Sequence, residues 1–568
     1  MKKIWVFIFI STLGILIFFG FYRSQIFKKV ALGNKIYGGV FTYYSSEKQN
    51  CYFPLSSNSI NEQRVLSQIF EPLLIIDAEN KIIGNLAEKF TVSQDYKTIQ
   101  LKIRSAVYFH ADPCFGGSTK KMTVEDVKFS LEFACSASPL NKLSHFLKDK
   151  IVGAEAFYKL SRNSFPKSGV SGIKIKDENT IEIKLTNSYT SFLNILTHPN
   201  LTVFSKSAYD YYGVEIVKHA VGTGCFYLGA ATENGVSLLR NNDYWKKDEF
   251  GNQLPFLDEI KVVYSKNERE QYNAFGNKKA DVLFELPLEN LDDAFGSLSS
   301  AKNGGNLLHK IIYKKGSKIN YLAFDCQSIP FNNEKVRRAF SLAIDKKFVC
   351  DEVLNGDGRP AEFGFVPECN FYTPNKSERV EYNPELAKKL FYESGYTPNN
   401  PFPKLDLFVS SASGSLVDKW CRALVKQLNT NLGLELRVVN CSLKEKNSFI
   451  ASKKAKIWRT GWAADYADAD SFLALFCSQN KSENNQTRFY NKEYDRLFLA
   501  SQITTSQEER NKLQQKIDKL IIKTPIVIPV FSEDIFVVIN LRVRDFEFNE
   551  LGLIDFSKIY LKEIEKIK

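Results

Sequence analysis

The chain has 568 residues, and because a single hydrophobic core stops growing at about 250–300 residues, we expect two or three domains. A composition with 44% hydrophobic and 25% charged residues excludes a collagen-like, a largely disordered or a polytopic membrane protein. The formal net charge of +12 is compatible with nucleic-acid binding. Half of that excess, however, lies in the first 35 residues, at Lys2, Lys3, Arg23, Lys28, Lys29 and Lys35. Nucleic acid is therefore not an expected partner.

An uncharged run at residues 4–22 lies between these basic residues. A transmembrane helix needs about 20 mostly apolar residues, so this run can cross a bilayer. A cleaved signal peptide has a shorter apolar core followed by small residues, whereas RSQIFKK follows here. We therefore expect residues 1–35 to form an uncleaved membrane anchor and its flank. Positive charge on both sides leaves the orientation of the run open.

Strand and helix patterns alternate along the rest of the chain. Three segments show the period-two alternation of β-strands, at 99–103, 181–185 and 260–264. Four segments combine a helix-start signal with an apolar stripe, at 123–134, 383–395, 416–433 and 506–521. Thr123 with Asp126 is typical of a capping box at the start of the first of these helices. Interleaved strands and helices predict α/β domains with mixed sheets, and the absence of a flexible linker predicts a hinge.

Common catalytic and metal-binding motifs are absent from the sequence. The chain has no G-x-x-x-x-G-K-[ST] phosphate loop, no H-E-x-x-H and no G-x-S-x-G. The ten cysteines form no C-x-x-C pair and the five histidines are dispersed, so we expect neither a metal site nor a cofactor. Several cysteines are expected to be free and buried, and the sequence leaves any disulfide pairing open.

One polar cluster stands out, in the segment GWAADYADADSFL at 461–473. It places Asp465, Asp468 and Asp470 within six residues. A calcium loop would follow the D-x-[DN]-x-[DN]-G spacing, and no glycine follows Asp468 and Asp470 in this segment. A glycosidase would need a second carboxylate across a cleft, which a sequence alone cannot show. Asp468 and Asp470 also fit a solvated acidic turn.

A further interpretation of this cluster involves the aromatic residues beside it. Trp462 and Tyr466 flank Asp465. A desolvated carboxylate is a strong counter-ion for an ammonium group, and an indole ring adds a cation–π surface. The segment therefore fits a pocket that holds a charged amine.

Seven segments, taken in order, resemble the extracytoplasmic solute-binding proteins of ATP-driven importers for oligopeptides, dipeptides and, in some members, nickel or haem. The segments are EPLLIIDAENKIIGNLAEKF within 61–112, TVEDVKFSLEFA at 123–134, GTGCFYL at 222–228, RNNDYWKKDEFGNQLPFLDEIKVVY at 240–264, PFNNEKVRRAFSLAIDKKFV at 330–349, YNPELAKKLFYESGY at 382–396 and GWAADYADADSFL. Any one of them is a weak signal, but the ordered series extends over most of the chain.

This resemblance implies an α/β clamshell of two lobes with mixed sheets, a hinge and an extra subdomain in the first lobe. The first lobe would have three parts, at 36–53, 171–266 and 534–568. Its subdomain would comprise residues 54–170, and the second lobe residues 267–533.

The resemblance also implies a solute site. Asp465 matches the aspartate that binds a peptide's terminal ammonium, and Trp462 lines the same pocket. Arg459 matches a basic residue that offsets the ligand's carboxylate in some oligopeptide binders. The strand around Tyr43 and the turn at Gly222–Cys225 would face the cleft through their backbone. The expected solute-binding residues are Asp465, Trp462, Arg459, Tyr466, Tyr43, Gly224 and Cys225.

By resemblance, the protein is a receptor and not an enzyme. It would bind oligopeptides or dipeptides and deliver them to the permease and ATPase subunits of an ABC importer. It would be a monomer, anchored on the extracytoplasmic (periplasmic) face of the bacterial inner membrane. The alternatives are another solute on the same fold (a nickel chelate, haem, an oligosaccharide or a murein peptide) and, in another class, a hydrolase that uses the aspartate cluster.

Overall fold

The computed structural model describes residues 30–57, 59–77, 81–284, 309–377, 379–479, 485–549 and 551–563. The apolar run at 4–22, expected to be an anchor, lies outside these residues. Among the described residues, no helix combines the length and the apolar character that a membrane crossing requires.

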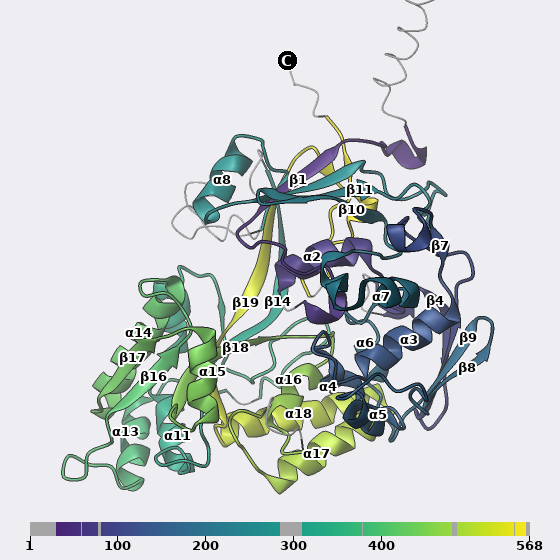
Figure 1. Cartoon of the computed structure of the whole chain (residues 1–568). Helices are drawn as coiled ribbons and strands as arrows, with labels where there is room; N and C mark the ends of the chain where they lie inside the picture. The colour runs from purple at the N-terminus through teal and green to yellow at the C-terminus, as the bar shows by residue number, and fades with distance from the viewer. Residues whose placement is uncertain are drawn as a thin grey trace, which may run out of the picture.

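A mixed sheet of eleven strands runs through the whole molecule (Figure 1). Ten strands follow one path in the order β10 (Phe226–Thr232), β11 (Gly235–Arg240), β12 (Glu259–Tyr264), β1 (Val40–Ser45), β13 (Val282–Leu283), β19 (Val527–Asn540), β14 (His309–Phe324), β18 (Ile457–Ala463), β16 (Leu405–Val409) and β17 (Leu436–Asn440). The remaining strand, β15 (Arg359–Pro360), pairs with β19 off this path.

The long antiparallel strands β14 and β19 connect two separate bodies, as Figure 1 shows. One end of the pair adjoins β13 and β1, and the other adjoins β18. Between these ends the pairing shifts register from Lys314 to Lys318, and β19 is only partly buried at Glu533–Phe536. A Cβ on Gly316 would lie 2.1 Å from the carbonyl oxygen of Glu533, so only glycine fits at this crossing.

The first lobe surrounds a large apolar core that includes Phe41, Phe53 and Phe133. A second sheet in this lobe has the order β4 (Ala87–Val92), β5 (Thr98–Ile103), β9 (Thr180–Lys184) and β8 (Ile173–Asp177). Its helices include α2 (Ile60–Ile69), α3 (Val124–Ala134), α4 (Ser144–Leu147), α5 (Ala154–Leu160), α6 (Phe192–Ile195) and α7 (Lys206–Tyr212).

The second lobe places an apolar cluster on each face of its part of the sheet. Neighbouring residues of β18 point to opposite sides, so Ile457 joins one cluster and Trp458 the other. Helices α11 (Glu334–Leu342), α13 (Pro384–Glu393) and α14 (Leu416–Leu432) contribute to the first cluster. Helices α15 (Leu443–Ala451), α16 (Asp470–Leu473), α17 (Lys492–Ile503) and α18 (Gln507–Lys523) contribute to the second.

The elements expected from periodicity are confirmed. β5, β9 and β12 occupy the three predicted strand segments, and α3, α13, α14 and α18 the four predicted helices. Thr123 and Asp126 form the predicted capping box, each binding the other's backbone N–H. The expectation that several cysteines are free and buried is confirmed among the described residues, for example at Cys135, Cys225, Cys350 and Cys421.

One contact bears on where the chain leaves the first lobe. Helix α8 (Glu268–Gly276) and β13 lie within the range 267–533 that the sequence assigns to the second lobe. Yet β13 pairs with β1 at Tyr43, and Phe275 of α8 packs with Leu283 and Val538. Residues 268–283 therefore lie beside the first-lobe sheet.

Candidate functional site

Strand β18 brings the acidic segment to the junction between the lobes. β18 lies between β14 and β16, with Trp462 opposite Ile319 of β14. Directly after the strand, the N–H of Ala464 donates to the carbonyl oxygen of Ser317, 3.1 Å away. Ser317 is part of the register shift in β14, so the acidic segment begins where the two lobes meet.

Asp465 is a carboxylate with no compensating charge among the described residues. Its backbone N–H donates to Ser471 Oγ at 2.9 Å, and that hydroxyl lies 3.4 Å from Asp465 Oδ2. Burial raises the pKa of Asp465 to about 7, the Ser471 hydrogen bond opposes that rise, and the negative charge of Asp470 adds to it. No cation is among the described groups that shift this pKa.

Among the described residues, Asp468 and Asp470 lie close to a cation, the guanidinium of Arg510, whereas Asp465 does not. Arg510 of α18 binds Asp468 with two N–H donors, at 2.6 and 2.8 Å, and Gln514 adds a third at 2.9 Å. Asp470 accepts from Gln502 at 3.1 Å. Both carboxylates are buried, so the prediction of a solvated acidic turn is wrong for them. Their partners Arg510 and Gln502 lie on helices later in the chain, which a local sequence pattern does not indicate.

Trp462 is held next to Asp465. Its indole Nε1–H donates to the carbonyl oxygen of Ser471 at 3.0 Å, and the ring packs partly buried against the second cluster of the lobe. Ser471 therefore contacts both residues, through its hydroxyl and its carbonyl group. The structure thus brings Trp462 and Asp465 together.

Arg459 is a second charge that forms no ion pair among the described residues, although the carboxylate of Glu533 acts on it from a distance. Its Nη2 donates to Asn320 Oδ1, and Asn320 in turn donates to Glu533 at 2.7 Å. Its guanidinium lies 5.4 Å from the centre of the Trp420 ring. Burial lowers the pKa of Arg459, and its buried Nε has no hydrogen-bond acceptor among the described residues.

Tyr466 packs into the core of the first lobe. Its ring is buried among first-lobe residues and meets the ring of Phe146 edge-on, with 5.9 Å between the centres. That Tyr466 contacts solute stays a prediction.

Tyr43 does not offer a surface to a ligand either. Its side chain is buried between Phe284 and Phe556 in the first-lobe core. Its backbone is paired with Val262 on one side and Val282 on the other. Within the described part of the chain, β1 therefore has no free edge at Tyr43, because the short strand β13, which no sequence pattern indicated, pairs with it there.

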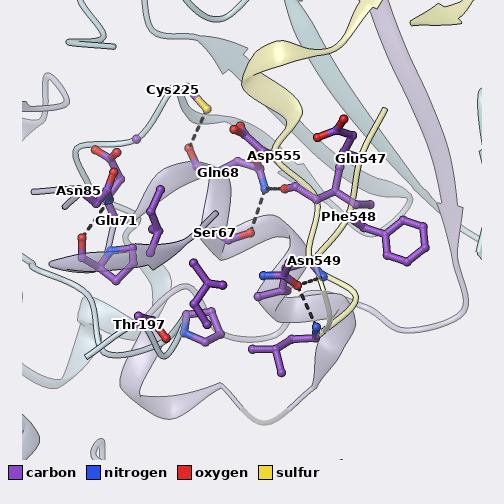
Figure 2. A pocket seen from close by; sticks show the side chains of 18 of the residues that line it. Ser67, Gln68, Glu71, Asn85, Thr197, Cys225, Glu547, Phe548, Asn549 and Asp555 are labelled. Atoms are coloured by element: carbon purple, nitrogen blue, oxygen red, sulfur yellow. Dashed lines mark hydrogen bonds between the residues drawn. The ribbon is translucent and has the colours of Figure 1, made fainter. Parts of the chain in front are cut away.

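Gly224 and Cys225 line a cavity of about 320 Å³ in the first lobe, which Figure 2 shows from close by. Helix α2, strands β2 (Leu74–Ile76) and β3 (Ile82–Gly84), and the C-terminal segment 547–558 form its walls. Lys314 of β14 lines it from the crossing strands. Its apolar lining residues are Phe70, Pro72, Ile75, Ile76, Ile83, Pro199, Phe548, Leu551, Leu553 and Ile554.

Two polar residues of this cavity were not identified from the sequence. Glu71 is buried and accepts hydrogen bonds from Thr223, Tyr244 and Trp245, at 2.9 to 3.0 Å. It fixes the turn that carries Gly224, where a Cβ would lie 2.2 Å from the carbonyl oxygen of Gln68. Asn85 is 1% exposed, and its Oδ1 has no donor among the described residues. In the sequence, only the place of Glu71 in the EPL motif could have pointed to these two residues.

The described residues contain no group of three or more His, Cys, Asp or Glu side chains placed to hold a metal ion. No histidine or methionine is among the described lining residues of the cavity.

The sequence has clear relatives among curated proteins. Glutathione-binding protein GsiB of Salmonella typhimurium is 27% identical over 491 residues, which cover 84% of this chain and 86% of that protein. Heme-binding protein A of Haemophilus influenzae is 25% identical over 492 residues, covering 82% of each.

Solved structures share the fold. DppA of Helicobacter pylori in complex with the peptide STSA has a TM-score of 0.76 at 21% identity, and the match covers 93% of this chain and 99% of that one. The Escherichia coli murein tripeptide-binding protein MppA has a TM-score of 0.74 at 18% identity, covering 94% and 99%. The fold is therefore the two-lobed, mixed α/β architecture of periplasmic binding proteins.

The family comparison covers the acidic segment and, in the cavity wall, the turn with Gly224 and Cys225. Residues 81–484, well over half of the chain, match the family model described as "Bacterial extracellular solute-binding proteins, family 5 Middle". This chain therefore belongs to family 5 of the bacterial extracellular solute-binding proteins.

Proposed function

We propose that this protein is a receptor that binds a short peptide by its terminal ammonium at Asp465 and delivers it to an ABC importer. The observation that carries the proposal is the state of Asp465, a partly buried carboxylate at the junction of the lobes with no cation among the groups that act on it. A buried charge is stable only when it is paired, so this one is suited to a partner that arrives with the ligand.

The surroundings of Asp465 suit an ammonium group. The carboxylate supplies the opposite charge, and the neighbouring indole of Trp462 supplies a face for a cation–π contact. Closure of the lobes excludes water, which lowers the local dielectric and strengthens the ion pair. The ammonium therefore fixes which end of the peptide enters first.

Arg459 is the group we assign to the ligand's carboxylate. It lies in β18, six residues before Asp465, and its buried Nε–H has no acceptor among the described residues. A guanidinium recognises a carboxylate through two parallel N–H donors. The two charges together favour a zwitterionic ligand.

The cavity of Figure 2 is where we place a side chain of the ligand. A volume of about 320 Å³ lies at the lower end of the range for small-molecule sites, so it suits a residue-sized group rather than a long peptide. Asn85 Oδ1 offers a hydrogen-bond acceptor inside it. Short peptides of the size of glutathione or a tripeptide, which relatives are named for, fit this description.

The other solutes fit less well. Haem iron and nickel are commonly bound by imidazole, thioether or thiolate ligands. The described lining offers Cys225 alone, and burial raises its pKa well above the ordinary value, which disfavours the thiolate. A hydrolase would need a carboxylate facing Asp465, but the one that acts on it, Asp470, lies on the same segment and is bound by Gln502.

We also propose how the parts of the chain move and where they reside. The hinge lies at the register shift of β14, residues 314–318, and at residues 533–534 of β19. This assigns residues 268–283 to the first lobe and keeps the second lobe between these two crossings. The run at 4–22 anchors a monomer on the extracytoplasmic face of the membrane, where the permease and ATPase of the importer receive the ligand.

The proposal is tested by titration calorimetry of Asp465→Asn with trialanine and with glutathione. Loss of one partner of a buried charge pair should weaken binding by about 2–5 kcal/mol while leaving the fold intact. Asp210→Asn, an exposed first-lobe change, is the matched control. Equal affinity of Asp465→Asn and the unaltered protein would contradict the proposal. Native mass spectrometry of the protein from cells identifies a ligand that copurifies.

A further inference from the structure

The two lobes touch at a second place besides the crossing strands. Helix α6 of the first lobe and the segment that precedes it lie beside α16 and α17 of the second lobe (Figure 1). Here the N–H of Thr190 donates to the carbonyl oxygen of Gln502 at 3.1 Å. The hydroxyl of Ser191 lies 3.4 Å from Gln502 Oε1. Thr190 and Ser191 directly precede Phe192 of the first-lobe core, and Gln502 lies in α17, whose Phe498 belongs to a second-lobe core. We therefore expect these hydrogen bonds to break when the lobes part.

Asn194 makes the most specific contact across this junction. Its Nδ2 donates to Asp468 Oδ2 at 3.0 Å and to the carbonyl oxygen of Ala467 at 3.1 Å. Asp468 keeps Arg510 and Gln514 as partners on its own lobe. Removing the Asn194 amide therefore leaves no buried charge unpaired.

Tyr466 adds an apolar contact at the same place. It belongs to the second lobe by sequence, but its ring is buried against Phe146 among first-lobe core residues. It directly follows Asp465, the proposed ammonium site. Within four residues, the segment 465–468 thus carries both the proposed ammonium-binding carboxylate and the contacts to the first lobe.

We propose that Tyr466 and Asn194 form a clasp that holds the lobes closed and sets the affinity for solute without touching it. A ligand's apparent affinity scales with the fraction of protein in the binding-competent state. A closed state stabilised by the clasp is therefore more populated before the ligand arrives. Both are positioning residues, and only the affinity part of this inference rests on the proposed function.

The amide of Thr190 reports on the clasp directly. Its hydrogen-bond acceptor is on the other lobe, so its exchange with deuterium requires the lobes to part. In the full-length, ligand-free protein, Asn194→Ala should speed exchange at Thr190 by about 5- to 30-fold, the effect of one or two lost hydrogen bonds. Exchange at Ile183, within the four-stranded sheet of the first lobe, should not change.

The matched control is Asn163→Ala, an exposed asparagine of the first lobe. It should leave exchange at both amides unchanged. The affinity of Asn194→Ala for trialanine, measured by calorimetry, should fall, by at most the factor by which the Thr190 exchange rises. Tyr466→Ala, which removes the ring that meets Phe146, should likewise speed exchange at Thr190.

Two results would overturn the clasp. One is unchanged exchange at Thr190 in Asn194→Ala. The other is equally faster exchange at Ile183, which would mean that the substitution loosens the fold as a whole. Failure of trialanine to bind any variant would refute the peptide proposal instead, because the exchange measurements need no ligand.

Discussion

Asp465 and Asp468 lie three residues apart in one segment, yet their surroundings are opposite. Asp468 is enclosed by the guanidinium of Arg510, the amide of Gln514 and, across the lobes, the amide of Asn194. Asp465 accepts a hydrogen bond from the hydroxyl of Ser471, and burial raises its pKa. Two carboxylates of one motif thus serve different ends.

The difference teaches how to separate structural from ligand-binding charges. A carboxylate whose hydrogen bonds are supplied by the protein contributes to the fold, since removing it strands its partner. A carboxylate that is desolvated without a counter-charge costs stability in the empty protein and is repaid by a cationic ligand. Arg459, with an unused buried donor, resembles Asp465 in this respect.

The sharpest way to break this comparison is Asp468→Ala. It leaves Arg510, 3% exposed, as a buried charge without its main partner. We expect the free energy of unfolding to fall by about 3–5 kcal/mol in urea titrations followed by fluorescence. Asp465→Ala is the matched control and should not lower it. Equal losses in the two variants would remove the distinction.

Arg459→Met tests the second uncompensated charge. It should weaken trialanine binding by about 1.5–3 kcal/mol, the usual size of a hydrogen bond to a charged group. Trialanine with an amidated C-terminus should bind the variant and the unaltered protein alike, because it carries no terminal carboxylate. A similar loss with both peptides would assign Arg459 to the framework of β18.

The pH dependence of binding provides a smaller, graded effect. With the pKa of Asp465 raised to about 7, protonation competes with the ligand's ammonium below that pH. Affinity should fall about tenfold for each unit of pH below 7, equivalent to about 1.4 kcal/mol. In Asp465→Asn this slope should vanish. Asp470 also acts on the group, so Asp470→Asn should move the midpoint to lower pH. A slope that persists in Asp465→Asn would place the titrating group elsewhere.

Local features of the fold were predictable from local sequence. The capping box at Thr123 and the alternation at 99–103 depend on neighbours within a few residues, and both are present in the structure. The surroundings of Asp468 depend on Arg510, 42 residues later, and those of Tyr43 on a two-residue strand. No pattern within a short window specifies such contacts.

The same limit applies to the candidate site. The cluster at Asp465 and Trp462 was visible as a run of polar and aromatic residues. The sequence did not show which of the three carboxylates lacks a charged partner among the described residues, because that depends on the position of α18. Tyr466 was expected beside the solute as a neighbour in sequence, whereas its side chain crosses to the other lobe.

The central claim is that Asp465 binds the ammonium of a peptide, and acetylation of that ammonium tests it most directly. Calorimetry compares trialanine with N-acetyltrialanine on the unaltered protein and on Asp465→Asn. We predict that acetylation weakens binding to the unaltered protein by about 30-fold or more, the lower bound for a broken buried charge pair, and has little effect on Asp465→Asn. Equal affinity of the unaltered protein for both peptides would contradict the account.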